Sequence, residues 1–67
     1  EKKSYIPQTG DIIFFDWNGD GHVQHVGIVE KVENGKVYTI EGNSKDEVRN
    51  KNYSLTNKSI YGYGFVN

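Results

Sequence analysis

The chain has 67 residues, room for one small domain, and a domain of this size buries only roughly 60% of the surface that its unfolded chain exposes. It contains no cysteine, which excludes a disulfide, a Cys-ligated zinc site and a thiol nucleophile from these residues. Eight basic residues are scattered among nine acidic ones, for a formal charge of -1, so the sequence predicts no nucleic-acid partner.

The first half of the chain starts with a lead-in and one short strand. Residues 1–9 show no apolar period and contain the only proline, Pro7. Residues 11–17, DIIFFDW, are aromatic and β-branched, and the NGDG sequence at 18–21 favours a tight loop after them. The longest unbroken apolar run is IIFF and no signal peptide opens the sequence, so we expect no membrane span and no membrane partner.

The rest of the chain is typical of antiparallel strands. Residues 23–33 and 36–43 are rich in valine and isoleucine, and the Asn-Gly pair between them is a strong hairpin signal. Two further strands are expected at 47–54 and 60–66. Helical spacing of apolar residues is not sustained anywhere. We therefore expect about five antiparallel strands in a twisted sheet or half-barrel.

Three polar residues at one end of the predicted hairpin are candidates for catalysis. His25 begins one strand, and Glu41 and Asn43 lie near the end of its partner. A carboxylate or amide that holds one ring nitrogen of a histidine leaves the other nitrogen free to act as a base. The competing interpretation is that His25 is an ordinary strand residue and that Glu-Gly-Asn belongs to a turn.

The catalytic interpretation depends on the register of this hairpin. A two-residue turn at 34–35 places Glu41 on the face opposite to His25. A three-residue turn at 33–35, or a bulge elsewhere in the pair, places His25, Glu41 and Asn43 on one face. The catalytic interpretation therefore predicts the register that places these residues on one face, whichever irregularity produces it.

Other residues near this end of the hairpin have weaker signals. Trp17 borders the loop that leads to His25, and we expect it to be the aromatic residue closest to the site and to bind substrate, although aromatic residues more often serve as core or cross-strand contacts. His22 is expected to be a solvated loop residue.

The loop itself contains part of a calcium-binding pattern. Asp16, Asn18 and Asp20, followed by Gly21, match the first half of a calcium loop. The twelfth position of such a loop is Gly27 and not the usual bidentate glutamate. An Asx-type turn is the main interpretation, and no cofactor is expected, with calcium as the alternative.

Several of these motifs resemble the CHAP domain, the cysteine, histidine-dependent amidohydrolase/peptidase family of papain-like peptidoglycan hydrolases. The resemblance extends over residues 7–66, and its most specific elements are Gly10-Asp11, HVGIV at 25–29 and EGN at 41–43. It implies that His25 is the catalytic histidine, that Glu41 orients it and that Asn43 supports the imidazole. Gln24 departs from the family, which often has an acid there.

The resemblance also implies an α+β papain-like fold of which residues 1–67 form the C-terminal β half, without the helical N-terminal half that carries the cysteine nucleophile. The complete domain would be a cysteine-dependent peptidoglycan amidase or endopeptidase, secreted or associated with the cell wall, with bacterial peptidoglycan and its own N-terminal half as partners. This chain alone would be inactive, and its exposed sheet could pair with a second copy. The alternative function is a non-catalytic β-barrel module that binds a wall polymer or a protein.

Overall fold

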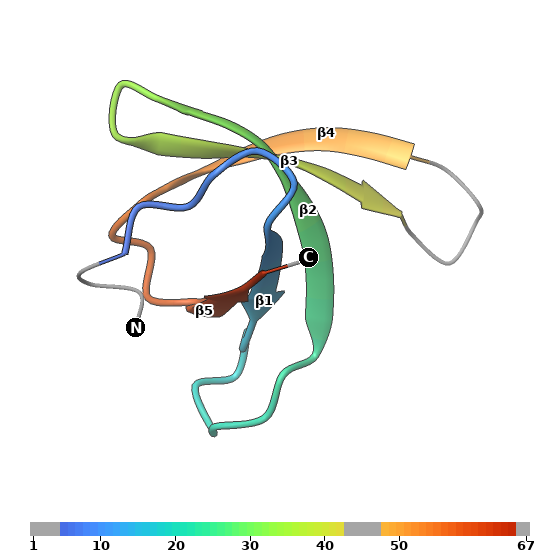
Figure 1. Cartoon of the computed structure of the whole chain (residues 1–67). Coiled ribbons are helices and arrows are strands. Elements are labelled where there is room, and N and C mark those ends of the chain that lie inside the picture. Colours follow the sequence, from blue (N-terminus) through green and yellow to red (C-terminus); the bar gives the residue numbers. More distant parts are fainter. Residues whose placement is uncertain (1–4, 43–47, 66–67) are drawn as a thin grey trace.

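The computed structural model describes residues 5–42 and 48–65, and these form one five-stranded sheet. The strands are β1 (Ile12–Phe15), β2 (His25–Glu33), β3 (Lys36–Gly42), β4 (Val48–Ser54) and β5 (Ile60–Gly64). Every neighbouring pair is antiparallel, in the order β4-β3-β2-β1-β5 (Figure 1). The predicted five-stranded antiparallel sheet is confirmed, with strand ends that differ from the predicted ones by up to two residues.

The sheet is twisted but open, because β4 and β5 are its two edges and do not pair with each other (Figure 1). The described residues contain strands, turns and loops and no helix, so the helical part of the expected α+β fold is not among them. In this part of the chain, accordingly, no helix has the length and apolar character needed to cross a membrane.

In the β2–β3 hairpin a bulge produces the register that the catalytic interpretation requires, with His25 and Glu41 on one face. Asn34 and Gly35 both have positive φ, 55° and 76°, and form a two-residue turn flanked by the pair Glu33–Lys36. The register then shifts by one residue between Val29 and Lys31, so Glu30 is the extra residue. The three-residue turn is therefore wrong, and the alternative of a bulge elsewhere in the pair is correct.

The lead-in segment packs along this bulge and satisfies its backbone. The hydroxyl of Thr9 donates a hydrogen bond of 2.8 Å to the carbonyl oxygen of Glu30. The backbone N–H of Gly10 donates to the Val29 carbonyl, and the Val29 N–H donates to the Asp11 carbonyl. Backbone groups at a bulge lack their partners in the neighbouring strand. Here the lead-in segment supplies hydrogen-bond partners for the backbone at and next to Glu30.

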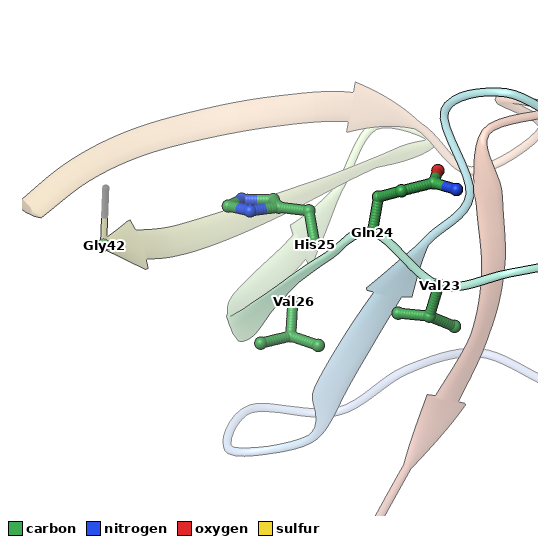
Figure 2. A pocket seen from close by; sticks show the side chains of 5 residues that line it. All are labelled: Val23, Gln24, His25, Val26 and Gly42. Carbon is green, nitrogen blue, oxygen red and sulfur yellow. The ribbon is translucent and has the colours of Figure 1, made fainter. Parts of the chain in front are cut away.

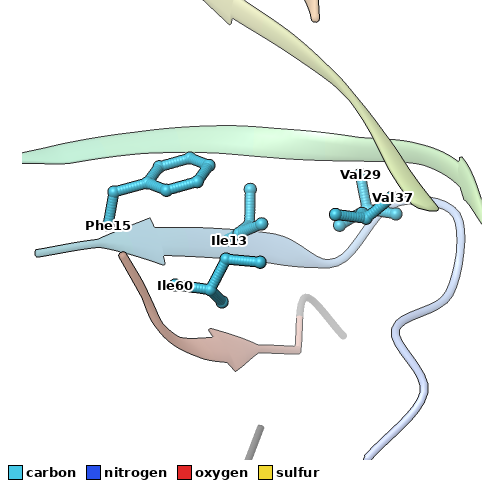
Figure 3. Close-up of a cluster of buried hydrophobic side chains, with 5 residues drawn as sticks. All are labelled: Ile13, Phe15, Val29, Val37 and Ile60. Atoms are coloured by element: carbon cyan, nitrogen blue, oxygen red, sulfur yellow. The ribbon is translucent and has the colours of Figure 1, made fainter. Parts of the chain in front are cut away.

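The core of the domain lies on one face of the curled sheet. Its five fully buried apolar side chains come from four of the five strands and meet between them (Figure 3): Ile13, Phe15, Val29, Val37 and Ile60. Because strand residues alternate between faces, the face that carries Ile13, Phe15 and Val29 also carries His25. The candidate histidine therefore lies at the end of the core face.

The opposite face exposes apolar side chains over three neighbouring strands. Val26 and Ile28 of β2, Ile40 of β3 and Val48 of β4 are between 38% and 71% exposed. Together with Ile12, Gly27 and Gly42 they line a hollow of about 380 Å³. We call these four exposed residues the outer apolar face. A contiguous apolar surface of this kind indicates a surface that another element or molecule covers.

Candidate active site

The site is built around a close pair between His25 of β2 and Glu41 of β3. The distance from His25 Nε2 to Glu41 Oε1 is 2.8 Å. Glu41 is 4% exposed, whereas 28% of the His25 side chain is exposed. The carboxylate is thus held inside the fold and the imidazole lies between it and solvent.

The second oxygen of Glu41 accepts two further hydrogen bonds. The hydroxyl of Thr39 donates to Oε2 at 2.6 Å and the hydroxyl of Tyr53 donates to it at 2.8 Å. Burial alone would raise the pKa of Glu41, but the hydrogen bonds from Thr39, Tyr53 and His25 outweigh it and lower that pKa. Glu41 is therefore an ionised carboxylate at neutral pH.

The charge of Glu41 fixes the roles of the two imidazole nitrogens. An ionised carboxylate can only accept a hydrogen bond, so His25 Nε2 carries the proton that is shared with Glu41. In the neutral imidazole Nδ1 then has a free lone pair. The geometry can therefore supply a general base at Nδ1 and stabilise the imidazolium that forms when Nδ1 takes a proton.

A glycine makes room for the Glu41 side chain. The β2–β3 pairing Ile28–Ile40, continued by one residue, places Gly27 opposite Glu41. A Cβ atom at Gly27 would lie 2.9 Å from Glu41 Cγ, closer than real Cβ atoms approach other atoms. A side chain at this position would therefore force Glu41 or the backbone next to it to shift.

Aromatic rings pack beside the imidazole. Trp17 stacks on Phe15 with 4.6 Å between ring centroids and an interplanar angle of 12°, and its ring lies 6.0 Å from that of His25. Tyr53 completes the group at 4.8 Å from Phe15. We call Phe15, Trp17 and Tyr53 the aromatic stack. Trp17 is 46% exposed and lies next to His25, but the ring of Phe15 is closer to the imidazole, at 5.7 Å between centroids, so Trp17 is not the aromatic residue closest to His25.

A shallow hollow of about 510 Å³ opens beside His25, at the end of the sheet where β2 begins (Figure 2). Its lining comes from the start of β2, the residues just before it and the end of β3: Val23, Gln24, His25, Val26 and Gly42. This hollow shares Val26 and Gly42 with the one on the outer apolar face. An open space thus reaches the imidazole from outside the fold.

The protein-family comparison matches the model of the CHAP domain to residues 1–43, more than half of the chain and a segment that contains both His25 and Glu41. The chain belongs to the CHAP domain family. This confirms the family that the sequence motifs suggested, while the match itself ends before β4 and β5. No curated protein and no solved structure matches the chain.

In this CHAP domain the loop before β2 is organised by the side chains of Asp16 and Gln24. Asp16 accepts backbone N–H bonds from Gly19 and Asp20 on Oδ1 and from Gly21 on Oδ2. Burial would raise the pKa of Asp16, but these bonds from the backbone lower it. Gln24 Oε1 accepts the N–H of Trp17 at 2.8 Å, which fixes the backbone next to the indole ring.

The same contacts bear on the calcium alternative for the CHAP loop. Both oxygens of Asp16 are occupied by backbone donors, and Asp20 Oδ1 accepts the N–H of His22, which favours the turn interpretation. Within residues 5–42 and 48–65, no three His, Cys, Asp or Glu side chains are grouped so that they could hold a metal ion. Calcium binding by Asp16, Asn18 and Asp20 stays a prediction, and the hydrogen bonds of Asp16 are those of a turn.

The remaining predicted site residues have different outcomes. Asn43 lies outside the residues that the structure describes, so its support of the imidazole stays a prediction. His22 has 84% of its side chain exposed, as expected for a loop residue, and lies 3.6 Å from Asp20.

Two residues of the site were not predicted, Thr39 and Tyr53. Alternation along β3 could have indicated Thr39, which shares a face with Glu41.

Proposed function

We propose that this chain is the C-terminal β portion of a cysteine-dependent peptidoglycan hydrolase, an amidase or endopeptidase that cleaves amide bonds in bacterial cell wall. One observation carries the proposal: an ionised, buried Glu41 holds His25 by Nε2 beside an open hollow, in a chain of the CHAP family. A histidine held in this way is the base that a cysteine nucleophile needs.

The reaction starts with a proton transfer to His25. Nδ1 takes the proton of a cysteine thiol, and the thiolate attacks the carbonyl carbon of the wall amide. The imidazolium, stabilised by Glu41, then gives its proton to the amine as the carbon–nitrogen bond breaks. A water molecule that loses a proton to His25 hydrolyses the thioester and regenerates the thiol. The imidazolium returns the proton taken from water to the departing thiolate, and His25 is neutral again.

The thiol must come from outside this chain, which has no cysteine. We propose that it lies on a helical N-terminal half of the same papain-like domain. The outer apolar face supports this arrangement, because its exposed residues need a cover and its hollow shares Val26 and Gly42 with the hollow at His25. The chain alone would then be inactive, and in isolation it could pair with a second copy through this face.

Trp17 is the proposed substrate contact. One side of its ring stacks on Phe15, and almost half of the residue is exposed next to His25. Aromatic rings that are held rigidly and partly exposed bind the apolar faces of sugars and peptides. We place the substrate strand of peptidoglycan against Trp17, and the protein itself outside the cell or at the cell wall, where this substrate is found.

The test uses the full-length protein that contains this chain and purified peptidoglycan. We expect new free amino groups to appear as the wall polymer is cut, and alkylation of thiols to stop their release. Protein that sediments with peptidoglycan without releasing amines would support the alternative, a non-catalytic binding module. A full-length protein without cysteine would also contradict the proposal.

A further inference from the structure

Tyr53 belongs to β4, in a part of the chain that the CHAP family model does not cover. It pairs with Val37 across the β3–β4 ladder, and the pairing Thr39–Lys51 sets the same register further along β3. Tyr53 therefore faces the side of the sheet that carries the core and Glu41. The position of Tyr53 next to Glu41 thus depends on the register in which the edge strand β4 pairs with β3.

The two carboxylate oxygens of Glu41 have different hydrogen-bond partners, and the hydroxyl of Tyr53 belongs to only one of the two sets. Tyr53 and Thr39 both donate to Oε2, and His25 is bonded to Oε1. With Oε2 held from two directions, rotation of the carboxylate would break two hydrogen bonds in a buried site. Oε1 is thereby kept in the plane and direction that His25 requires.

The ring of Tyr53 has a second set of contacts. It lies 4.8 Å from Phe15 and 6.2 Å from Trp17, measured between ring centroids. The same residue thus contacts the indole beside His25 and the acid that holds the imidazole. These two contacts can be separated by experiment, because phenylalanine keeps the ring and removes only the hydroxyl.

We propose that Tyr53 is a positioning residue of the His25–Glu41 pair, acting through its hydrogen bond to Glu41 Oε2 so that Oε1 stays directed at the imidazole. Its effect on hydrolysis rests on the proposed function, but its effect on Glu41 does not. If Tyr53 served only for packing, its ring alone would matter and Tyr53→Phe would leave Glu41 unchanged.

The test compares Tyr53→Phe with Tyr63→Phe. Tyr63 is a matched control because its buried hydroxyl has no hydrogen-bond partner among the described residues. In the protein labelled with ¹³C, the Glu41 carboxyl signal is followed against pH. Loss of one hydrogen bond to the carboxylate should raise the pKa of Glu41 by about one pH unit in Tyr53→Phe. Tyr63→Phe should titrate like the parent protein.

The neighbouring charges stay the same in both variants. His25 faces Glu41 from β2, and Arg49 is its cross-strand partner on β4. A difference between the variants therefore reports the Tyr53 hydroxyl. In full-length protein that releases amines from peptidoglycan, Tyr53→Phe should also slow release by about tenfold, with the substrate dependence little changed.

An unchanged Glu41 titration in Tyr53→Phe would overturn the proposal, even if hydrolysis were slower. A raised pKa of Glu41 would support it, even if the full-length protein hydrolysed no peptidoglycan, in which case the proposed function alone would fail.

Discussion

His25→Ala in the full-length protein should lower the release of amines from peptidoglycan by at least about 10²-fold to 10⁴-fold, the range for loss of a general base. The loss should be larger than that of any neighbouring substitution, because in the proposed reaction His25 exchanges a proton with both the thiol and the leaving amine. The fold should persist, because His25 lies beside an open hollow and water can fill the space that its truncation leaves.

His22→Ala is the matched control for this substitution. It removes a histidine three residues away whose side chain is 84% exposed and lies 3.6 Å from Asp20. Its rate of hydrolysis should match that of the parent protein. If His25→Ala kept a tenth or more of the parent rate while thermal unfolding showed an intact fold, His25 would not be the base.

Glu41→Ala should lower the free energy of unfolding by about 3 kcal/mol at neutral pH. The substitution removes the acceptor of Thr39, which is fully buried, and of Tyr53, so two hydroxyl groups are left without their hydrogen bonds. It also removes the charge that faces His25. Urea denaturation of the protein and the variant measures the difference.

The effect of Glu41→Ala should depend on pH. The folded protein lowers the pKa of Glu41 below its ordinary value of 4.5. The stabilisation by Glu41 is therefore complete above about pH 4.5 and is lost as the pH falls through the lowered pKa. The gap between parent and variant should narrow in acid; an equal gap at pH 7 and pH 3 would contradict this account.

Glu33→Ala provides the surface comparison for Glu41→Ala. Glu33 also lies in the β2–β3 hairpin, but its carboxylate pairs with Lys31 at 3.1 Å and both side chains are more than half exposed. An exposed ion pair of this kind stabilises a protein by about 0–1 kcal/mol. The variant should therefore unfold at nearly the urea concentration of the parent protein.

The sequence predicted the strands because they depend on local patterns, whereas the hairpin register that brings Glu41 to His25 was predicted only from the expected contact between these two residues. Asn34-Gly35 specifies the turn, and alternation assigns His25 to a face. The bulge at Glu30 could not be located in the same way, since Thr9, far away in the sequence, bonds to it. The requirement that Glu41 reach His25 predicted the shift without giving its place.

The support of Glu41 was harder to predict than the pair itself. Tyr53 reaches Glu41 only because the β3–β4 register pairs Val37 with Tyr53, and no turn signal between these strands fixes that register. The acidic loop was ambiguous for a related reason. Asp16 can accept backbone N–H groups or bind a cation, and only the three-dimensional structure shows that its two oxygens face Gly19, Asp20 and Gly21.

The most direct test of the central claim is the ¹⁵N spectrum of the His25 imidazole in the folded protein, at a pH where the ring is neutral. If Glu41 holds His25 as the structure shows, the proton resides on Nε2 and Nδ1 has the chemical shift of an unprotonated nitrogen. A neutral ring with its proton on Nδ1 would mean that the carboxylate does not orient this histidine.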